Sequence, residues 1–289
     1  MTWVVSLVGA LLVGLVLWDV FQTLWYPSAQ GRLSRALMMG TWRLTGRLGR
    51  GARKRSGPLA LVAVIGAWGA LVVVGGALVY WPHVPTAFTY GPGVVPDDGA
   101  ELLEALYLSL VSVATLGFGD VVPTVGWLRA AVPLQALIGF ALLTAAVSWV
   151  LQVYPALNRR RTLSLHLAAL REAGTLEALG ALTGVTAARI LGTLATSLTK
   201  VRVDLTQYSE TYYFQDESPE AVLGLQVGYA HDLAEAGARS ADPDVRHAAA
   251  VLTESIADLA RVIGAQFVDA ADGTVAVLEA YAADQRRGR

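Results

Sequence analysis

The stretch that decides the fold runs from residue 100 to residue 120. It begins with fifteen mainly apolar residues, AELLEALYLSLVSVA, and ends with the hexapeptide Thr115-Leu116-Gly117-Phe118-Gly119-Asp120. As a helix, the apolar part would be about 22 Å long, which is too short to cross roughly 30 Å of hydrocarbon. Two glutamates in its first turn suit the positive end of a helix dipole. We therefore expect a short helix that leads directly into a glycine-rich segment.

Three longer apolar stretches flank this region, at residues 2–26, 58–81 and 130–154. The last two contain no charged residue, and the first contains only Asp19. Each is long enough for a helix to cross a bilayer. Buried helices of a large soluble core are the alternative, but with 16% charged residues and a mean hydropathy of +0.49 the chain is typical of a membrane protein. The sequence predicts an all-α membrane protein with three transmembrane helices and a re-entrant segment at 100–114.

Charge is distributed unevenly along the chain. Residues 1–161 contain twelve basic and six acidic residues, whereas residues 162–289 contain ten basic and seventeen acidic ones. The basic residues gather between the first two spans and directly after the third, and the acidic ones of the first half lie mainly between the second and third. By the positive-inside rule, we expect a multi-pass protein of the cell membrane, plasma or inner, with its N-terminus outside and its C-terminus in the cytoplasm.

The basic segment between the first two spans has leucines that fall near one helical face, at Leu33, Leu37, Leu44 and Leu48. Arginines lie between them, which favours a helix lying on the cytoplasmic headgroups. A voltage sensor is the alternative, but it needs arginines that repeat along a spanning helix, and this segment is polar and rich in glycine.

The hexapeptide resembles the selectivity filter of the potassium-channel pore family, which reads T-x-G-Y/F-G-D. Its position between a short helix and a spanning helix is typical of simple two-span channels, and the resemblance covers roughly residues 58–154. It implies that backbone carbonyls replace the water shell of a transported K⁺ ion. Gly117 and Gly119 would permit the positive φ angles that this needs. The implied ion ligands are the carbonyls of Thr115, Leu116, Gly117 and Phe118, with the Thr115 hydroxyl.

The resemblance also implies roles for residues around the filter. Phe118 would pack behind the filter, Asp120 would lie at its outer mouth, and Tyr107 would belong to an aromatic cuff. Gly139 falls where the family has the hinge of its inner helix. Pro133 lies in the same helix and is a gating candidate or a tolerated transmembrane proline.

Two positions depart from the family pattern. Ala114 stands where many members have a second threonine, and Val111 stands where some hold a carboxylic acid bonded to the filter aspartate. Asp120 must then find another partner, such as Tyr107 or water. These departures leave a non-selective cation channel as an alternative to a potassium channel.

One filter motif cannot close a pore, and the chain contains no second copy of it. We therefore expect a homotetramer. The expected domains are an N-terminal helix with its basic segment at 1–57, a pore domain at 58–157 and a cytoplasmic helical domain at 158–289. The last would serve in assembly or gating.

The C-terminal region reads as helical because alanine and leucine are abundant and strand-like alternation is weak. Helices are expected near 163–173, 186–206, 219–237, 244–266 and 274–286. Ser218-Pro219 and Asp242-Pro243 are helix-start signals, and Gly174, Gly184 and Gly273 mark interruptions. The segment 207–218 is rich in tyrosine and acid. It is either an aromatic-anchored loop, which we favour, or a site for an unknown cytoplasmic ligand or partner.

Isolated polar residues support no catalytic site. Asp19 is expected to pair with a basic residue of the following loop rather than act as a sensor. His83 is expected to be a solvated loop residue rather than a pH sensor. No glycine-rich nucleotide fold, P-loop or metal-ligand spacing is present in the sequence. We expect no enzyme activity, no cofactor and no nucleic-acid partner, and keep a non-conducting membrane-anchored sensor or scaffold as a further alternative.

Overall fold

The structure is a computed structural model that describes residues 2–25, 31–48, 55–92, 99–216, 218–269 and 273–287. It divides into two compact units. The first contains Met1–Leu37 and Leu61–Leu151, and the second contains Met38–Ala60 and Gln152–Arg289. The expected boundaries at residues 57 and 157 differ from this division, which groups Met38–Ala60 with the C-terminal region.

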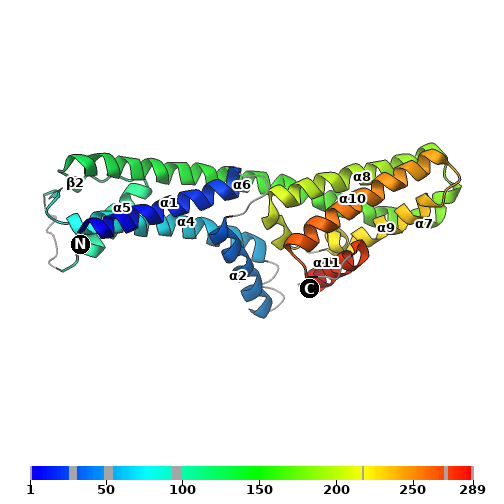
Figure 1. Cartoon of the computed structure of the whole chain (residues 1–289), viewed down its shortest axis with the longest axis horizontal. Helices are drawn as coiled ribbons and strands as arrows, with labels where there is room; N and C mark the ends of the chain where they lie inside the picture. The colour runs from blue at the N-terminus through cyan, green and yellow to red at the C-terminus, as the bar shows by residue number, and fades with distance from the viewer. Residues whose placement is uncertain are drawn as a thin grey trace. The chain divides into compact units, whose positions relative to one another are not determined.

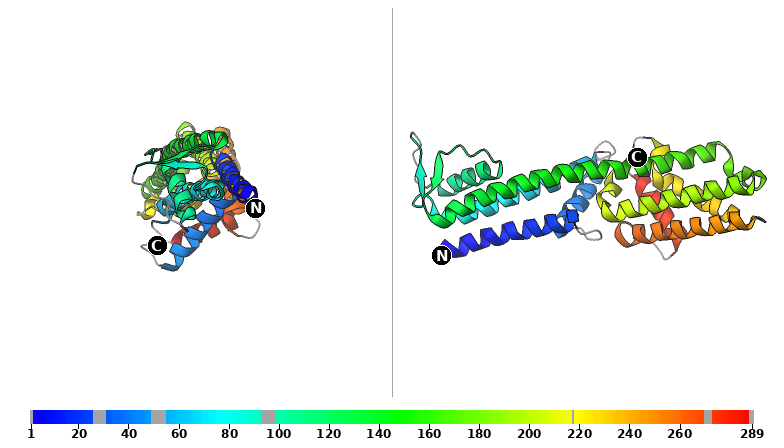
Figure 2. Two further views of the ribbon diagram at one scale, coloured as in Figure 1. Left: turned by 90° about the vertical axis from the view of Figure 1, so that its left-hand side faces the viewer. Right: turned by 90° about the horizontal axis from the view of Figure 1, so that it is seen from above.

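Three long helices dominate the first unit: α1 (Thr2–Trp25), α4 (Ser56–Tyr80) and the first half of α6 (Gly126–Glu172). They run alongside one another (Figures 1 and 2). Each is long and apolar enough to cross a membrane, as the sequence predicted. Their composition explains this placement, since few polar side chains interrupt their apolar surfaces.

The chain alternates in direction across these three helices. Trp3 near the start of α1 lies 5.4 Å from the His83 ring and 5.5 Å from the Trp127 ring, measured between ring centroids. His83 ends the short 3₁₀ helix η1 (Trp81–His83) that follows α4, and Trp127 is the second residue of α6. The start of α1, the end of α4 and the start of α6 therefore share one end of the unit.

The expected short helix is present as α5 (Glu101–Val113). Two short strands, β1 (Phe88–Tyr90) and β2 (Val121–Pro123), pair antiparallel beside it, with Phe88 opposite Pro123. The all-α expectation is wrong in this detail. The pair joins the segment before α5 to the segment after the glycine-rich hexapeptide, so both ends of that region are fixed.

Asp19 of α1 binds the first residues of α2 (Arg32–Leu48). The Asp19 carboxylate, only 7% exposed, accepts hydrogen bonds from the Leu33 amide at 3.0 Å and from the Ser34 amide and hydroxyl at 3.3 and 2.6 Å. The Trp68 indole of α4 donates at 3.0 Å. The expected pairing with a basic side chain is wrong. Among the described residues, Asp19 instead caps the α2 N-terminus.

Helix α2 packs against the protein through a face that does not include Leu44, and its expected place on the headgroups stays a prediction. Ser34, Met38 and Thr45 are buried, whereas Leu44 is 58% exposed. Trp42 packs on the Tyr213 ring of the second unit at 5.5 Å. The helix itself was predicted. Its contacts with the C-terminal region were not, because they depend on a tertiary partner.

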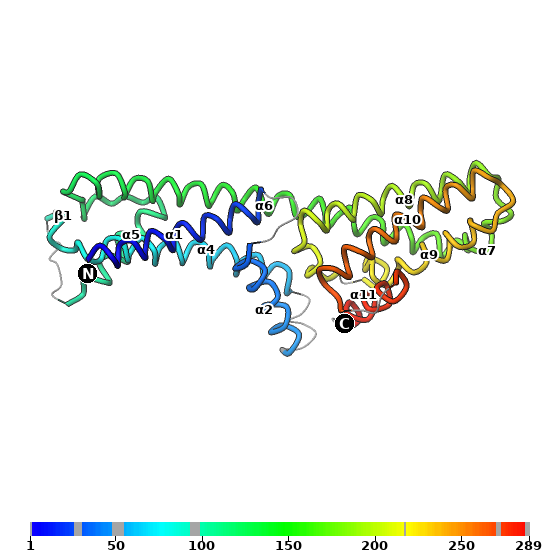
Figure 3. The backbone as a smooth tube through the Cα atoms, viewed as in Figure 1, coloured from blue at the N-terminus to red at the C-terminus, as the bar shows by residue number. Residues whose placement is uncertain are grey.

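Helices also build the second unit (Figure 3). They are the second half of α6, α7 (Thr175–Ala178), α8 (Gly184–Gln207), α9 (Leu223–Ala238), α10 (Pro243–Gln266) and α11 (Thr274–Arg287), with 3₁₀ turns η2 (Leu179–Ala181), η3 (Ser209–Tyr213) and η4 (Pro219–Ala221). Asp242 caps α10 as predicted, accepting from the Asp244 amide at 2.8 Å. Two details differ: residues 163–172 continue α6, and Pro219 begins only a short turn.

The segment around η3 is anchored by its aromatic residues, as favoured from the sequence. Tyr212 is 1% exposed, stacks on Phe267 at 4.2 Å and donates to Asp284 at 2.6 Å. The hydroxyl of Ser56 donates to the Tyr213 carbonyl at 2.9 Å. Aromatic packing and satisfied polar groups therefore fix this segment inside the second unit.

Three consecutive arginines of α6 bind the same region. Arg159 pairs with Asp204, with 2.7 Å between Nε and Oδ2, and Arg161 pairs with Asp216. Arg160 is 5% exposed and donates to the Thr211 and Phe214 carbonyls and to Asp216. The positive-inside rule used these arginines to predict the cytoplasmic side of the membrane. In the structure they also bind carboxylates and carbonyls of the second unit.

Candidate functional site

The hexapeptide begins where α5 ends. The Thr115 amide donates to the Ser112 carbonyl at 2.9 Å, and the Leu116 amide donates to the Val111 carbonyl at 3.0 Å. These bonds complete the last turn of α5 and turn the chain into the glycine-rich segment. The C-terminal end of a helix carries partial negative charge, so this junction favours a nearby cation.

Backbone conformation alternates along residues 115–119. Thr115, Gly117 and Gly119 have φ angles of 56°, 54° and 76°. The two glycines adopt these values cheaply, as expected. Among the described residues, Thr115 is the only one other than glycine that has a positive φ. For a β-branched side chain this conformation is strained. Positive φ at three alternating positions, with strain at Thr115, indicates a segment shaped for a purpose other than stability.

Side chains of this segment are exposed in the single chain. Residues 114–119 are all exposed, with Leu116 at 57% and Phe118 at 64%. The expected packing of Phe118 behind the filter therefore requires a surface from another chain, and it stays a prediction. Thr115, Leu116, Gly117 and Phe118 are exposed, so their role as ion ligands also stays a prediction.

Asp120 is held at the end of the segment by the residue that the sequence suggested. The Tyr107 hydroxyl donates to Asp120 Oδ2, and the Val121 amide donates to Oδ1 at 3.1 Å. The Gly91 amide donates to the Asp120 carbonyl at 2.7 Å. The bond to Asp120 raises the pKa of the Tyr107 phenol, so the donor stays protonated at neutral pH. A filter-supporting role for this pair remains a prediction.

Gly139 of α6 lies against the end of α5. A Cβ atom at this position would be 2.0 Å from the Val113 carbonyl oxygen, so only glycine fits. Val113 lies two residues before Thr115, so Gly139 packs directly beside the start of the hexapeptide. Helix α6 is continuous through both Pro133 and Gly139. The hinge and gating roles of these two residues stay predictions.

A buried polar network that the sequence analysis missed joins α4, α5 and α6. Gln135, only 5% exposed, accepts from the Tyr80 hydroxyl at 2.6 Å and donates to the Ser109 hydroxyl at 2.7 Å. Ser109 donates onward to the Val73 carbonyl at 2.6 Å. A Cβ atom at Gly76 would be 1.9 Å from Gln135 Nε2. The signal was available, because Gln135 is an amide within an apolar span.

His83 is not the solvated loop residue that was expected. Its ring lies 5.0 Å from the Trp127 ring and is within hydrogen-bonding distance of the Ser6 hydroxyl, at 3.2 Å from Nε2. Ser6 also donates to the Val79 carbonyl at 3.1 Å. His83 therefore holds α1 against the end of α4.

No group of three or more histidine and acidic side chains that could hold a metal ion occurs within the described part of the chain. The polar groups of the hexapeptide are backbone carbonyls and one hydroxyl. Uncharged oxygens of this kind suit a monovalent cation that must enter and leave.

Comparison with known proteins gives one finding for this region. Residues 67–154 match the model of a family described as an ion channel, and this segment contains the end of α4, all of α5, the hexapeptide and the first part of α6. The resemblance to the potassium-channel pore family is thereby confirmed, and it lies in a chain with three helices long and apolar enough to cross a membrane. No curated protein and no solved structure matches the chain.

Proposed function

We propose that this protein is a potassium-selective channel. Four copies of residues 115–119 would line one axis, and K⁺ would bind to the carbonyls of Thr115, Leu116, Gly117 and Phe118 and to the Thr115 hydroxyl. The observation that carries the proposal is the alternation of positive φ at Thr115, Gly117 and Gly119 in an exposed segment directly after α5.

A homotetramer accounts for features that the single chain leaves incomplete. Leu116 and Phe118 are more than half exposed, although they lie in a segment with strained backbone. Neighbouring copies would cover these side chains and close the ring of carbonyls. The strain at Thr115 would then be offset by ion binding and by packing between subunits.

The orientation proposed from the sequence places the N-terminus outside the cell and residues 158–289 in the cytoplasm. It is supported by the arginines of α2, which are not balanced by any acid within 31–48, and by the alternating direction of α1, α4 and α6. The cytoplasmic unit would act in assembly or gating, because α6 contributes residues to both units.

Ion flux from liposomes that contain the purified full-length protein tests the proposal. We expect K⁺ efflux to exceed Na⁺ efflux greatly and to vanish in Gly117→Asp, which places a side chain and a charge at a positive-φ position. Gly126→Ala is the matched control, since Gly126 has no atom within 4 Å of an added Cβ and no positive φ. Equal K⁺ and Na⁺ flux would favour a non-selective cation channel.

The proposed role of the cytoplasmic unit needs its own test. We expect a protein that ends after Arg161 to lose tetramers or to change its open probability. Unchanged tetramers and unchanged opening would contradict the role. If neither the full chain nor this shortened chain passes ions, a non-conducting membrane-anchored scaffold becomes the better account.

A further inference from the structure

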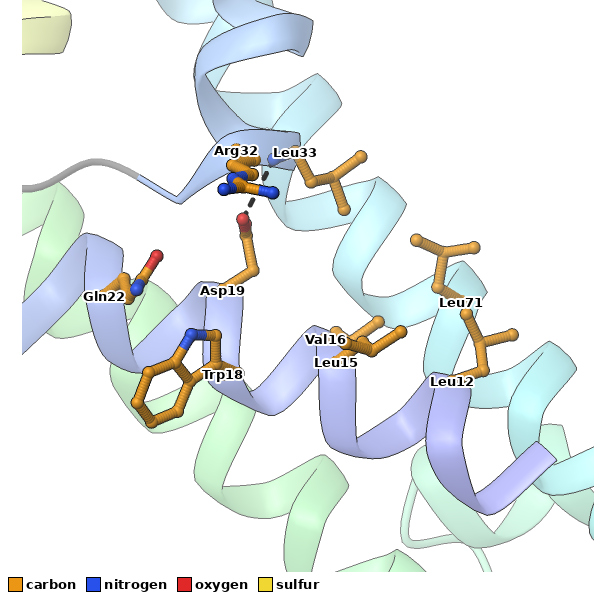
Figure 4. Close-up of a pocket in the computed structure, with 9 residues that line it drawn as sticks. All are labelled: Leu12, Leu15, Val16, Trp18, Asp19, Gln22, Arg32, Leu33 and Leu71. Carbon is orange, nitrogen blue, oxygen red and sulfur yellow. Dashed lines mark hydrogen bonds between the residues drawn. The ribbon is translucent and has the colours of Figure 1, made fainter. Parts of the chain in front are cut away.

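A groove in the first unit lies between α1, the start of α2 and α4. Its volume is about 500 Å³ (Figure 4). The groove is lined by apolar side chains of α1 and α4 together with three polar residues, namely Leu12, Leu15, Val16, Trp18, Leu33, Leu71, Asp19, Gln22 and Arg32. Apart from Leu71, these residues lie outside the segment that matches the ion-channel family.

The groove is divided into an apolar part and a polar end. Figure 4 shows Leu12 and Leu71 at one side and Asp19, Gln22 and Arg32 toward the other. The lining positions on α1 extend from residue 12 to residue 22, which is about 15 Å along a helix axis. An elongated apolar channel with polar groups at one end fits a molecule that has a chain and a headgroup.

Charge at the polar end favours an anion. The Asp19 carboxylate keeps its charge, but it is 7% exposed and already accepts four hydrogen bonds within the protein. The Arg32 guanidinium is exposed and makes no hydrogen bond or ion pair with another described residue. Arg35 follows on the same helix within the first unit, where residues 31–37 contain no acid.

Aromatic residues place the polar end at headgroup depth. Trp18 lines the groove and stacks on Phe21 at 5.9 Å, and Phe21 stacks on Trp25 at 6.0 Å. All three rings are at least 47% exposed. Exposed tryptophans near the end of a spanning helix are typical of the membrane interface.

We infer that this groove binds one anionic phospholipid of the bilayer leaflet next to α2. The headgroup phosphate lies at Arg32, and an acyl chain follows α1 past Leu15 toward Leu12. The inference rests on the membrane embedding of α1 and α4 and is independent of potassium conduction.

Lipid binding to the full-length protein in detergent, measured by native mass spectrometry, tests the inference. The probes are phosphatidylglycerol and phosphatidylcholine with the same acyl chains. We expect the wild type to bind phosphatidylglycerol more tightly. Arg32→Gln should weaken that binding about fivefold, the effect of one basic residue near an anionic lipid. Arg43→Gln, which removes the same charge elsewhere on α2, should leave it unchanged.

A second variant tests the groove without altering charge. Leu15→Trp fills the apolar part and should lower the occupancy of both lipids. Gly117→Asp should bind lipid like the wild type, so a failure of the channel proposal does not affect this test. The inference is overturned if Arg32→Gln and Arg43→Gln weaken binding equally, if the two lipids bind equally well, or if Leu15→Trp changes nothing. Displacement of the lipid by millimolar inorganic phosphate alone would also overturn it.

Discussion

The proposed filter segment (Thr115–Gly119) of the first unit and the arginine-aromatic cluster (Arg159–Arg161 with Tyr212 and Tyr213) of the second unit differ in how far their side chains are buried. In the cluster, Arg160 is 5% exposed and Tyr212 is 1% exposed, and each has polar partners in the same chain. In the filter segment, Leu116 and Phe118 are 57% and 64% exposed, and the backbone is strained at Thr115.

The contrast teaches that the two regions have different requirements. The cluster satisfies its charges and apolar surfaces within one chain, so it can serve stability by itself. The proposed filter segment leaves residues 115–119 exposed, and the frame around it maintains the strain at Thr115. Mutations in the two regions should therefore affect different measurements.

The largest effect on the frame is expected at Gly139. In Gly139→Ala the new methyl group would overlap the Val113 carbonyl oxygen, 2.0 Å away, and would push α6 from α5. Overpacking of this kind costs about 1–3 kcal/mol or more, and we expect loss of ion flux together with a lower melting temperature. Gly66→Ala is the control, because an added Cβ there meets no atom within 4 Å. Altered gating with unchanged stability would instead favour a hinge.

In the second unit, Arg160→Met should be strongly destabilising. It removes the donors to the Thr211 and Phe214 carbonyls and one partner of Asp216. Loss of one partner from a buried ionic group costs about 3–5 kcal/mol, which thermal unfolding would detect. Arg261→Met is the matched control, since the Arg261 side chain is 70% exposed and pairs with Asp258 on the surface. If Arg160→Met and Arg261→Met lowered stability equally, the buried arginine would contribute no more than the surface one, and the account would be contradicted.

A smaller effect is expected from Gln135→Leu. It leaves the Tyr80 and Ser109 hydroxyls without their partner at membrane depth. Hydrogen bonds between membrane helices contribute roughly 0.6 kcal/mol on average and up to about 1.7 kcal/mol. We therefore expect the free energy of unfolding to fall by about that amount, which thermal unfolding would detect. If this hydrogen-bond network holds the helices around the proposed filter in place, ion flux should decrease together with stability. An unchanged flux and melting temperature would show that apolar packing alone holds the three helices.

The smallest effect is expected from Tyr107→Phe, which removes one hydrogen bond to Asp120 and leaves the Val121 amide in place. We expect K⁺ current to begin normally and to decline several-fold faster during sustained opening, as recorded in planar bilayers. Tyr154→Phe, at an exposed position of α6, should behave as the wild type. A current that lasts as long as that of the wild type would contradict a filter-supporting role for Tyr107.

Patterns within single segments predicted much of the fold. Composition and length identified α1, α4 and α6 as spans, and the short apolar stretch identified α5. The hexapeptide is recognisable because its glycines are required by backbone conformation, whatever surrounds them. The capping signal at Asp242 was readable for the same reason: the cap bonds only to the next turn.

Features that depend on distant partners were not predictable in the same way. Strands β1 and β2 have three residues each, too few for alternation to show, and they pair across α5. Arg159 to Arg161 resembled the end of a membrane segment, but ion pairs with Asp204 and Asp216 let α6 continue through them. Asp19 has amide, hydroxyl and indole donors because the start of α2 and Trp68 of α4 lie beside it.

The most direct test of the central claim is the reversal potential of single-channel currents in a planar bilayer, with K⁺ on one side and an equal concentration of Na⁺ on the other. A potassium-selective filter at Thr115 to Gly119 predicts current carried by K⁺ alone and a reversal potential displaced far toward the value that stops K⁺ movement. A reversal potential near zero would contradict the account, because it would show that the carbonyl ring does not distinguish the two ions.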